Sequence, residues 1–117
     1  MFKTRKINIL GTEWTINVVN GEKSKYLKYG RLDGLCQYDN RIILVDNMTR
    51  IDITAEARVN IIKHSLRHEI VHAFLAESGL NYSAIYEGHW AENEEMIDWF
   101  AWQSPKIFEV YKELDIL

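Results

Sequence analysis

Apolar and polar residues alternate along the first part of the chain, a two-residue period that is typical of half-buried β-strands. The alternating apolar positions are Ile7, Ile9, Trp14, Ile16 and Val18. Gly11-Thr12 between the two runs suits a tight turn, so residues 5–19 are predicted to form a hairpin. Residues 20–33 are charged and contain Gly21 and Gly30, which favours a loop or a weak edge strand.

A second hairpin is predicted directly afterwards. Its strands would run from Leu35 to Tyr38 and from Ile42 to Val45, on either side of Asp39-Asn40, a pair that tolerates left-handed turn geometry. The unbroken apolar run of the second strand indicates a strand that is covered on both faces. Two successive hairpins predict a small antiparallel sheet.

The period lengthens to three or four residues from Thr54 onward. Thr54 is a suitable N-cap and Gly79 stands where a helix often ends, so a helix is predicted over about residues 55–78. Its apolar stripe is Val59, Ile62, Leu66, Ile70 and Ala73. Residues 79–89 are rich in glycine, asparagine and serine and are predicted to be a loop.

A second helix is predicted over residues 90–103, with Trp90, Trp99 and Trp102 on its buried face. Ser104-Pro105 would then provide the N-cap and the first-turn proline of a short last helix. Strands followed by helices predict an α+β fold, in which the small antiparallel sheet packs on the long helix. A length of 117 residues fits a single domain over residues 1–117.

The composition indicates in which cellular compartment the protein works and which partners it has. The single cysteine, Cys36, excludes an intramolecular disulfide and is expected to be a small core residue. No apolar run approaches the roughly 18 residues that cross a membrane. The basic start of the chain leads into a polar strand pattern and not into an apolar signal core. We therefore expect a protein of the reducing cytoplasm with no membrane partner.

The net charge of −3 argues against nucleic acid as a partner. One stretch of this acidic chain is nevertheless rich in positive charge. It contains Lys23, Lys25, Lys28 and Arg31. Two interpretations of the stretch stay open: a solvated loop, or a patch that contacts a substrate or nucleic acid.

Residues 68–72 form an H-E-x-x-H motif inside the predicted long helix. Positions i and i+4 lie one above the other on a helix, so His68 and His72 can converge on one metal ion. Glu69 lies beside them, where its carboxylate can act as the general base that takes a proton from water. Imidazole and carboxylate ligands suit Zn²⁺, so one zinc ion per chain is the expected cofactor, although manganese or iron would tolerate the same ligands.

The third metal ligand comes from a resemblance. An extended H-E-x-x-H-x-x-G-x-x-H motif is absent, because Leu75 and Ser78 stand where its glycine and third histidine would be. The segment from residue 93 to residue 98, Asn-Glu-Glu-Met-Ile-Asp, resembles the third-ligand segment of thermolysin-like peptidases. This resemblance implies that Glu94 binds the metal and that Asp98 accepts a hydrogen bond from a ligand histidine. Glu95 is the alternative ligand, about 100° further around the helix.

Other polar residues near the motif have less specific roles. His64 shares the helix face of the motif but lies about 12 Å from the second ligand histidine, too far to bind the same ion, and is interpreted as a surface histidine. Tyr82, Tyr86 and His89 are each close enough in sequence to donate to an oxyanion, as the reaction requires. For each of the three taken singly, a loop or packing role is the favoured interpretation.

The motif at 68–75 together with the segment at 93–101 resembles the minimal zincins of phages and mobile elements, and among known groups the ImmA/IrrE-like metallopeptidases. In that group the later helix carries an E-x-x-A-[ND]-x-F-A pattern, which Asp98, Phe100 and Ala101 match in part. The resemblance implies a peptidase acting on a protein or peptide, such as a repressor. It also implies that an edge strand beside the metal helix pairs with an extended substrate.

The expected function is therefore a zinc-dependent endopeptidase with His68, His72 and Glu94 as ligands and Glu69 as base. The alternative is a metal-stabilised binding or regulatory module without hydrolytic activity, for which Glu69 has no evident use. A third possibility, a DNA-associated protease resembling the SprT-like group, requires a basic surface that the overall charge does not supply.

Overall fold

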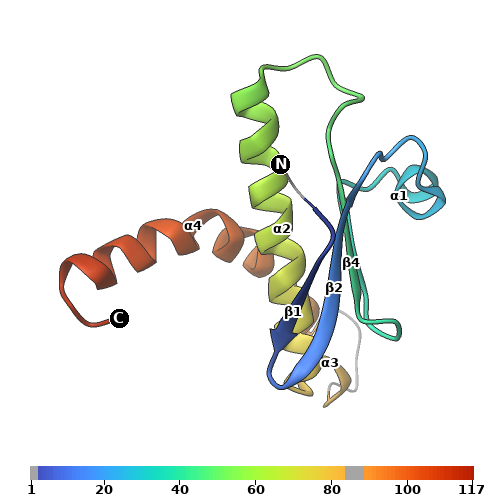
Figure 1. Cartoon of the computed structure of the whole chain (residues 1–117). Coiled ribbons are helices and arrows are strands. Elements are labelled where there is room, and N and C mark those ends of the chain that lie inside the picture. The colour runs from blue at the N-terminus through green and yellow to red at the C-terminus, as the bar shows by residue number, and fades with distance from the viewer. Residues whose placement is uncertain (1–2, 84–88) are drawn as a thin grey trace.

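The computed structural model describes residues 3–83 and 89–117. A four-stranded sheet lies on one side of a long helix, α2 (Ala55–Glu77), and a C-terminal helix, α4 (Glu94–Glu113), lies on a different side of α2 (Figure 1). Strands fill the first part of the chain and helices the second, so the predicted α+β class is confirmed.

The first predicted hairpin is present. It consists of β1 (Arg5–Ile9) and β2 (Thr12–Val19), which pair antiparallel. Leu10 and Gly11, with φ of 50° and 92°, make the two-residue turn between the strands. Such turns need positive φ at both central positions, because that backbone twist matches the twist of the flanking strands.

The second predicted hairpin is present as well, formed by β3 (Gly34–Gln37) and β4 (Ile42–Asp46). The sequence favours left-handed geometry at Asp39-Asn40, but Arg41 adopts it, with φ of 53°. The backbone carbonyl of Arg41 accepts a hydrogen bond of 2.9 Å from the backbone N–H of Thr15 on β2. The left-handed residue thus directs its carbonyl toward the neighbouring strand.

The sheet is mixed, which corrects the prediction of an antiparallel sheet. The strand order is β1-β2-β4-β3, and β2 and β4 run parallel, with Thr15 opposite Ile42 and Val19 opposite Asp46. Each hairpin is set locally by its own turn, whereas the pairing between hairpins depends on how the intervening segment crosses the sheet. In this order β4 is a central strand and β3 is an edge strand.

The core lies between one face of the sheet and α2. Its buried members are Ile9, Trp14, Ile16, Cys36, Ile43, Val45, Met48, Ile62 and Ala73. All four strands contribute to it, and Cys36 is the core residue that the sequence predicts. Leu44, which points to the opposite face of β4, is only 8 % exposed, so this strand is covered on both faces as predicted.

The helix that carries the H-E-x-x-H motif begins where the sequence predicts. The hydroxyl oxygen of Thr54 accepts a hydrogen bond of 3.1 Å from the backbone N–H of Ala57, which satisfies one of the free N–H groups of the first turn. The helix ends just before Gly79, whose φ is 87°. Ile62 and Ala73 of the predicted stripe are buried against the sheet.

Two segments that the sequence predicts as loops contain short helices. These are α1 (Lys25–Gly30) and α3 (Leu80–Ser83). Leu27 of α1 is 1 % exposed. Burial of this apolar side chain supports a short helix in a segment whose composition favours a loop. Part of the predicted loop at 79–89 lies outside the described residues.

After a short 3-10 turn, η1 (Trp90–Glu92), the chain forms one continuous helix and not the two predicted from Ser104-Pro105. A proline inside a helix leaves the carbonyl four residues earlier without its usual donor. Here that carbonyl belongs to Ala101, and it accepts a hydrogen bond of 2.5 Å from Nε–H of Arg67 on α2. A tertiary contact therefore compensates for the proline.

The tryptophans of this region are exposed, which corrects a further prediction. The exposed fractions of Trp90, Trp99 and Trp102 are 60 %, 58 % and 52 %. The residues that α4 buries are Ile97, Ala101 and Ser104. Beyond this narrow stripe the helix projects from the body of the protein (Figure 1), and the radius of gyration is 15.0 Å, against about 13 Å for a compact chain of this length. None of the helices in the described ranges is both long and apolar enough to span a membrane.

Candidate metal centre

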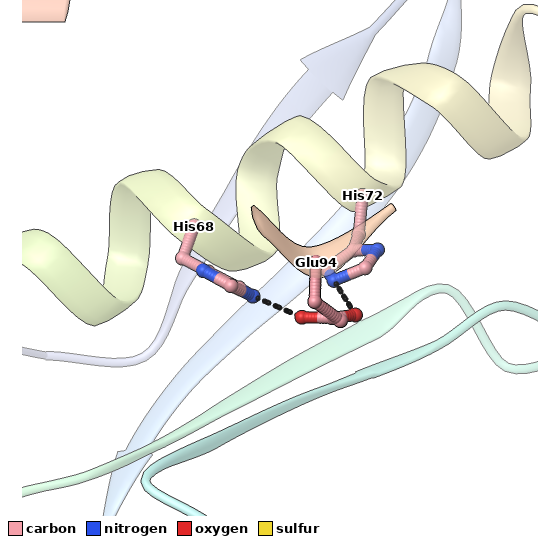
Figure 2. Close-up of side chains that lie close together, drawn as sticks. All are labelled: His68, His72 and Glu94. Atoms are coloured by element: carbon pink, nitrogen blue, oxygen red, sulfur yellow. Dashed lines mark hydrogen bonds and ion pairs between the residues drawn. The ribbon is translucent and has the colours of Figure 1, made fainter. Parts of the chain in front are cut away.

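His68 and His72 lie one turn apart on α2 and present their rings on the same side of the helix (Figure 2). The ring centroids are 5.1 Å apart and the ring planes are tilted by 57°. His72 is buried and His68 is half-buried. This is the arrangement that the i, i+4 spacing predicts, because both side chains leave the helix in nearly the same direction.

Glu94 reaches both imidazoles from the first residue of α4. The side chain of Asn93 accepts a hydrogen bond of 2.8 Å from the backbone N–H of Met96, which caps the helix and sets where its first turn begins. The two carboxylate oxygens of Glu94 each lie 2.9 Å from an Nε2 atom, one of His68 and one of His72 (Figure 2). One potential ligand atom from each of these three residues lies within 4.8 Å of the others.

The other ring nitrogen of each histidine has its own partner. Nδ1 of His68 lies 2.9 Å from a carboxylate oxygen of Asp98, and Nδ1 of His72 lies 3.3 Å from the hydroxyl of Tyr38. When Nδ1–H of His68 donates to Asp98, its Nε2 keeps a lone pair that faces the carboxylate of Glu94. The lone pairs of Nε2 and of the carboxylate repel each other unless a proton or a metal ion lies between them. The two imidazoles and the carboxylate fit Zn²⁺.

Glu69 is buried beside this ligand set, with an exposed fraction of 7 %. Burial raises the pKa of Glu69 to about 7; the neighbouring His68 opposes this shift and Glu94 adds to it. Gly34 on β3 leaves room for the carboxylate. A Cβ atom at that position would lie 3.0 Å from both Cγ and Oε1 of Glu69, closer than an ordinary contact.

A cleft of about 250 Å³ opens onto these side chains. It lies between α2, the start of α4 and the residues at the beginning of β3. Its lining includes His68, Glu69, Glu94 and Asp98 on one side and Leu32, Asp33 and Gly34 on the other. His68, Glu94 and the buried carboxylate of Glu69 are therefore reachable from the cleft, whereas His72 is buried behind its lining.

His64 is not the surface histidine that the sequence favours. Its side chain is 17 % exposed and its ring stacks on Trp102 with 4.0 Å between centroids. Nε2 of His64 lies 2.9 Å from Asp98 but lacks the alignment of a hydrogen bond. Partial burial on its own raises the pKa of Asp98, but the hydrogen bond with His68 and the nearby His64 outweigh it and lower the pKa below its usual range.

Several candidate residues lie apart from the centre. Glu95 is exposed and belongs neither to the ligand set nor to the cleft lining. Tyr82 is 65 % exposed, and His89 is buried with its Nε2 3.5 Å from Glu92. Neither Tyr82 nor His89 is among the described residues that line the cleft. Tyr86 lies outside the described residues.

Tyr38 and Gly34 are the site residues that the sequence analysis missed. Tyr38 reads as the end of a strand, and nothing local indicates a contact with a histidine 34 positions later. For Gly34 a weak signal exists, because a glycine at a strand often marks a close approach of another group. The identity of that group follows only from the packing of α2 against β3.

Comparison of the chain with protein-family models, with curated proteins and with solved structures found no match. An α+β fold by itself does not identify an activity. The residues of the site are therefore the basis for a function.

Proposed function

We propose that this protein is a zinc-dependent endopeptidase with His68, His72 and Glu94 as metal ligands and Glu69 as the general base. The observation that carries the proposal is the convergence of two imidazoles and one carboxylate, with a buried carboxylate beside them and a cleft that reaches His68, Glu94 and Glu69. Three protein ligands leave a coordination position open, as in catalytic zinc sites. A bound zinc ion would supply the Lewis acidity that polarises the scissile carbonyl.

The side chains around the ligands have separate tasks. Glu69 takes the proton from the attacking water as the new C–O bond forms, and returns it to the amine nitrogen when the C–N bond breaks. Asp98 holds His68 in the tautomer that presents Nε2 to the metal, and the hydroxyl of Tyr38 orients His72 in the same way.

The edge strand β3 supports an extended polypeptide as the substrate. In the described residues β3 is an edge strand of the sheet, and its first residue, Gly34, lies against Glu69, so this edge runs beside the cleft. An extended peptide can add to such an edge through backbone hydrogen bonds. We take the substrate to be a protein, such as a repressor. A reducing cytoplasm is the proposed setting, which the single buried Cys36 supports.

A metal-stabilised binding module is the second candidate, and one observation favours it. α4 packs on α2 through the narrow stripe of Ile97, Ala101 and Ser104, and the ligand set adds a direct connection between the two helices. A metal ion there would fasten α4 to the body of the protein. The two functions differ in their need for Glu69, which such a module does not use.

The deciding experiment measures zinc content and cleavage of unfolded casein by the wild type, Glu69→Gln and the exposed control Glu95→Gln. We expect about one zinc per chain in all three and a loss of cleavage of about 100-fold or more in Glu69→Gln only, which is the usual range for a general base. Stoichiometric zinc without cleavage by the wild type would favour the binding module. Absence of zinc from all three proteins would overturn both proposals.

A further inference from the structure

A second and larger pocket lies next to the cleft. Its volume is about 750 Å³, which is within the range of small-ligand sites, and it is formed by α1, the residues that follow α1, and the end of β4. Leu32 lines both this pocket and the cleft. Asp33 of the cleft also binds Arg50 of the pocket, with 2.8 Å between the carboxylate and the guanidinium. The two hollows therefore share a wall.

Positive charge dominates the walls of this pocket, which we call the basic pocket. Its charged lining consists of Lys25, Lys28, Arg31 and Arg50 with Glu22 and Asp46. Four positive groups against two negative groups leave a surplus of two positive charges, in a chain whose net charge is −3. A concave surface of this sign attracts anionic groups.

Three of the four cations are available to a ligand. Arg50 is held by Asp46 and Asp33, at 2.6 Å and 2.8 Å. Lys28 lies 4.0 Å from an exposed glutamate, a separation at which a solvated pair contributes little. Lys25 and Arg31 have no acidic partner within the described ranges.

The carboxylate of Asp46 is buried and hydrogen-bonded within the protein. This carboxylate is 1 % exposed and accepts hydrogen bonds of 3.0 Å from the backbone N–H groups of Gly21 and Met48. These bonds, together with Arg50, tie the segment before α1 to the end of β4. These contacts of Asp46 hold the wall of the pocket in place. The side chains of Lys25, Lys28 and Arg31 are exposed.

We propose that the basic pocket binds acidic side chains of the substrate next to the cleaved bond, an inference that rests on the proposed peptidase function. A peptide paired with the edge of β3 passes Leu32 as it leaves the cleft at the Gly34 end. Its next side chains then face the basic pocket, where Lys25, Lys28 and Arg31 pair with glutamate or aspartate. An acidic peptide is favoured over nucleic acid because the basic patch is small, the chain as a whole is acidic, and the adjoining strand edge suits a polypeptide.

The test measures binding to the Glu69→Gln protein, so that it does not depend on hydrolysis. The probes are a labelled alanine-based peptide with a run of glutamates and its glutamine counterpart. Substitution of Lys25, Lys28 and Arg31 by glutamine together should weaken binding of the glutamate peptide about tenfold, since an exposed charge contributes a factor of roughly two to five. Increasing salt should also weaken binding of the glutamate peptide to the protein whose pocket is unchanged.

The matched control replaces Lys63, Lys106 and Lys112, which are exposed and outside the pocket, by glutamine. Both triple variants remove the same charge, so a general electrostatic effect would weaken binding equally in the two. Equal losses, or equal affinity for the glutamate and glutamine peptides, would overturn the proposal. A single-stranded oligonucleotide that binds more tightly than the glutamate peptide, and loses affinity only in the pocket variant, would overturn it in favour of a nucleic-acid site.

The binding experiment and the casein assay on the wild type together separate this inference from the proposed function. Selective binding of the glutamate peptide by Glu69→Gln, with no cleavage of casein by the wild type, would support the basic pocket and count against the peptidase. Cleavage of casein without selective peptide binding would reject the pocket alone.

Discussion

At the scale of single residues, the two ring nitrogens of each proposed ligand histidine have separate partners. Nε2 of His68 and of His72 face Glu94, while their Nδ1 atoms face Asp98 and Tyr38. A ring held from both sides needs little rearrangement when a metal binds, because its rotation and tautomer are already selected. Among the three proposed ligands, Glu94 is the one that comes from another helix.

Glu94 should therefore matter much more to zinc affinity than its neighbour. We expect Glu94→Ala to lose about 100-fold or more in affinity, at least as much as removal of a group that merely supports a ligand, and Glu95→Ala to stay close to the wild type. Titration with zinc, followed by thermal unfolding, measures both effects. Zinc should raise the melting temperature of the wild type and of Glu95→Ala, since it binds the folded chain. Similar losses in the two variants would reject Glu94 as the ligand.

At the scale of secondary structure elements, the contact between α2 and α4 decides where the last helix runs. Pro105 would ordinarily end or kink a helix, at a cost of about 3 kcal/mol, because it removes a donor and crowds the preceding turn. The Nε–H group of Arg67 replaces the missing donor at the carbonyl of Ala101. This contact joins the two helices that carry the proposed metal ligands, so packing of α4 and assembly of that set support each other.

This compensation predicts coupling between Arg67 and Pro105. Arg67→Met keeps an unbranched apolar stem but leaves the carbonyl of Ala101 without a donor, so it should lower the free energy of unfolding by about 1–3 kcal/mol. In a Pro105→Ala background the backbone N–H of residue 105 can donate to that carbonyl, and the same arginine substitution should cost clearly less. Urea unfolding of the four proteins in a double-mutant cycle gives the coupling. Strictly additive effects would show that the arginine does not compensate for the proline.

At the scale of the whole molecule, Glu77 connects the end of α2 to the sheet. One of its carboxylate oxygens accepts hydrogen bonds of 2.8 Å from the indole N–H of Trp14 on β2 and from Nε–H of Arg41 in the β3–β4 connection. The hydrogen bonds from Arg41 and Trp14 lower the pKa of Glu77 below its ordinary value, against a small opposing effect of burial. The contact joins both hairpins to α2, the helix that carries His68 and His72.

Stability should consequently fall in acid partly through Glu77. A carboxyl whose pKa is lower in the folded than in the unfolded chain stabilises the fold above its unfolded pKa of about 4.5, and this contribution is lost as the pH falls through the folded value. Urea unfolding at about pH 6 and about pH 3 should therefore show a smaller loss of stability for Glu77→Gln than for the wild type. Glu109→Gln, at an exposed position of α4, should lose as much as the wild type. If Glu77→Gln loses as much too, the carboxylate does not hold the sheet to α2.

Local features were predicted well because their causes lie within a few residues. The turn at Gly11, the N-cap at Thr54 and the spacing of His68 and His72 each depend on neighbouring backbone geometry, and each is present in the structure. The same holds for the long helix, whose apolar stripe repeats with the helical period. A resemblance over a short segment was needed to place Glu94. Glu94 is on a different helix from the histidines, and the helical period does not predict the path of the chain between the two helices.

The sequence by itself determined both hairpins, the long helix with the H-E-x-x-H motif and the pair of histidines that one face of this helix presents. Only the tertiary structure decided the parallel pairing of β2 with β4, the continuity of α4 through Pro105 and the exposure of the tryptophans. It alone brought Tyr38 to His72 and stacked His64 on Trp102. The physical reason is the range of the interactions. Periodicity, turns and caps act between near neighbours in the chain, whereas these contacts join segments whose meeting depends on how the elements pack.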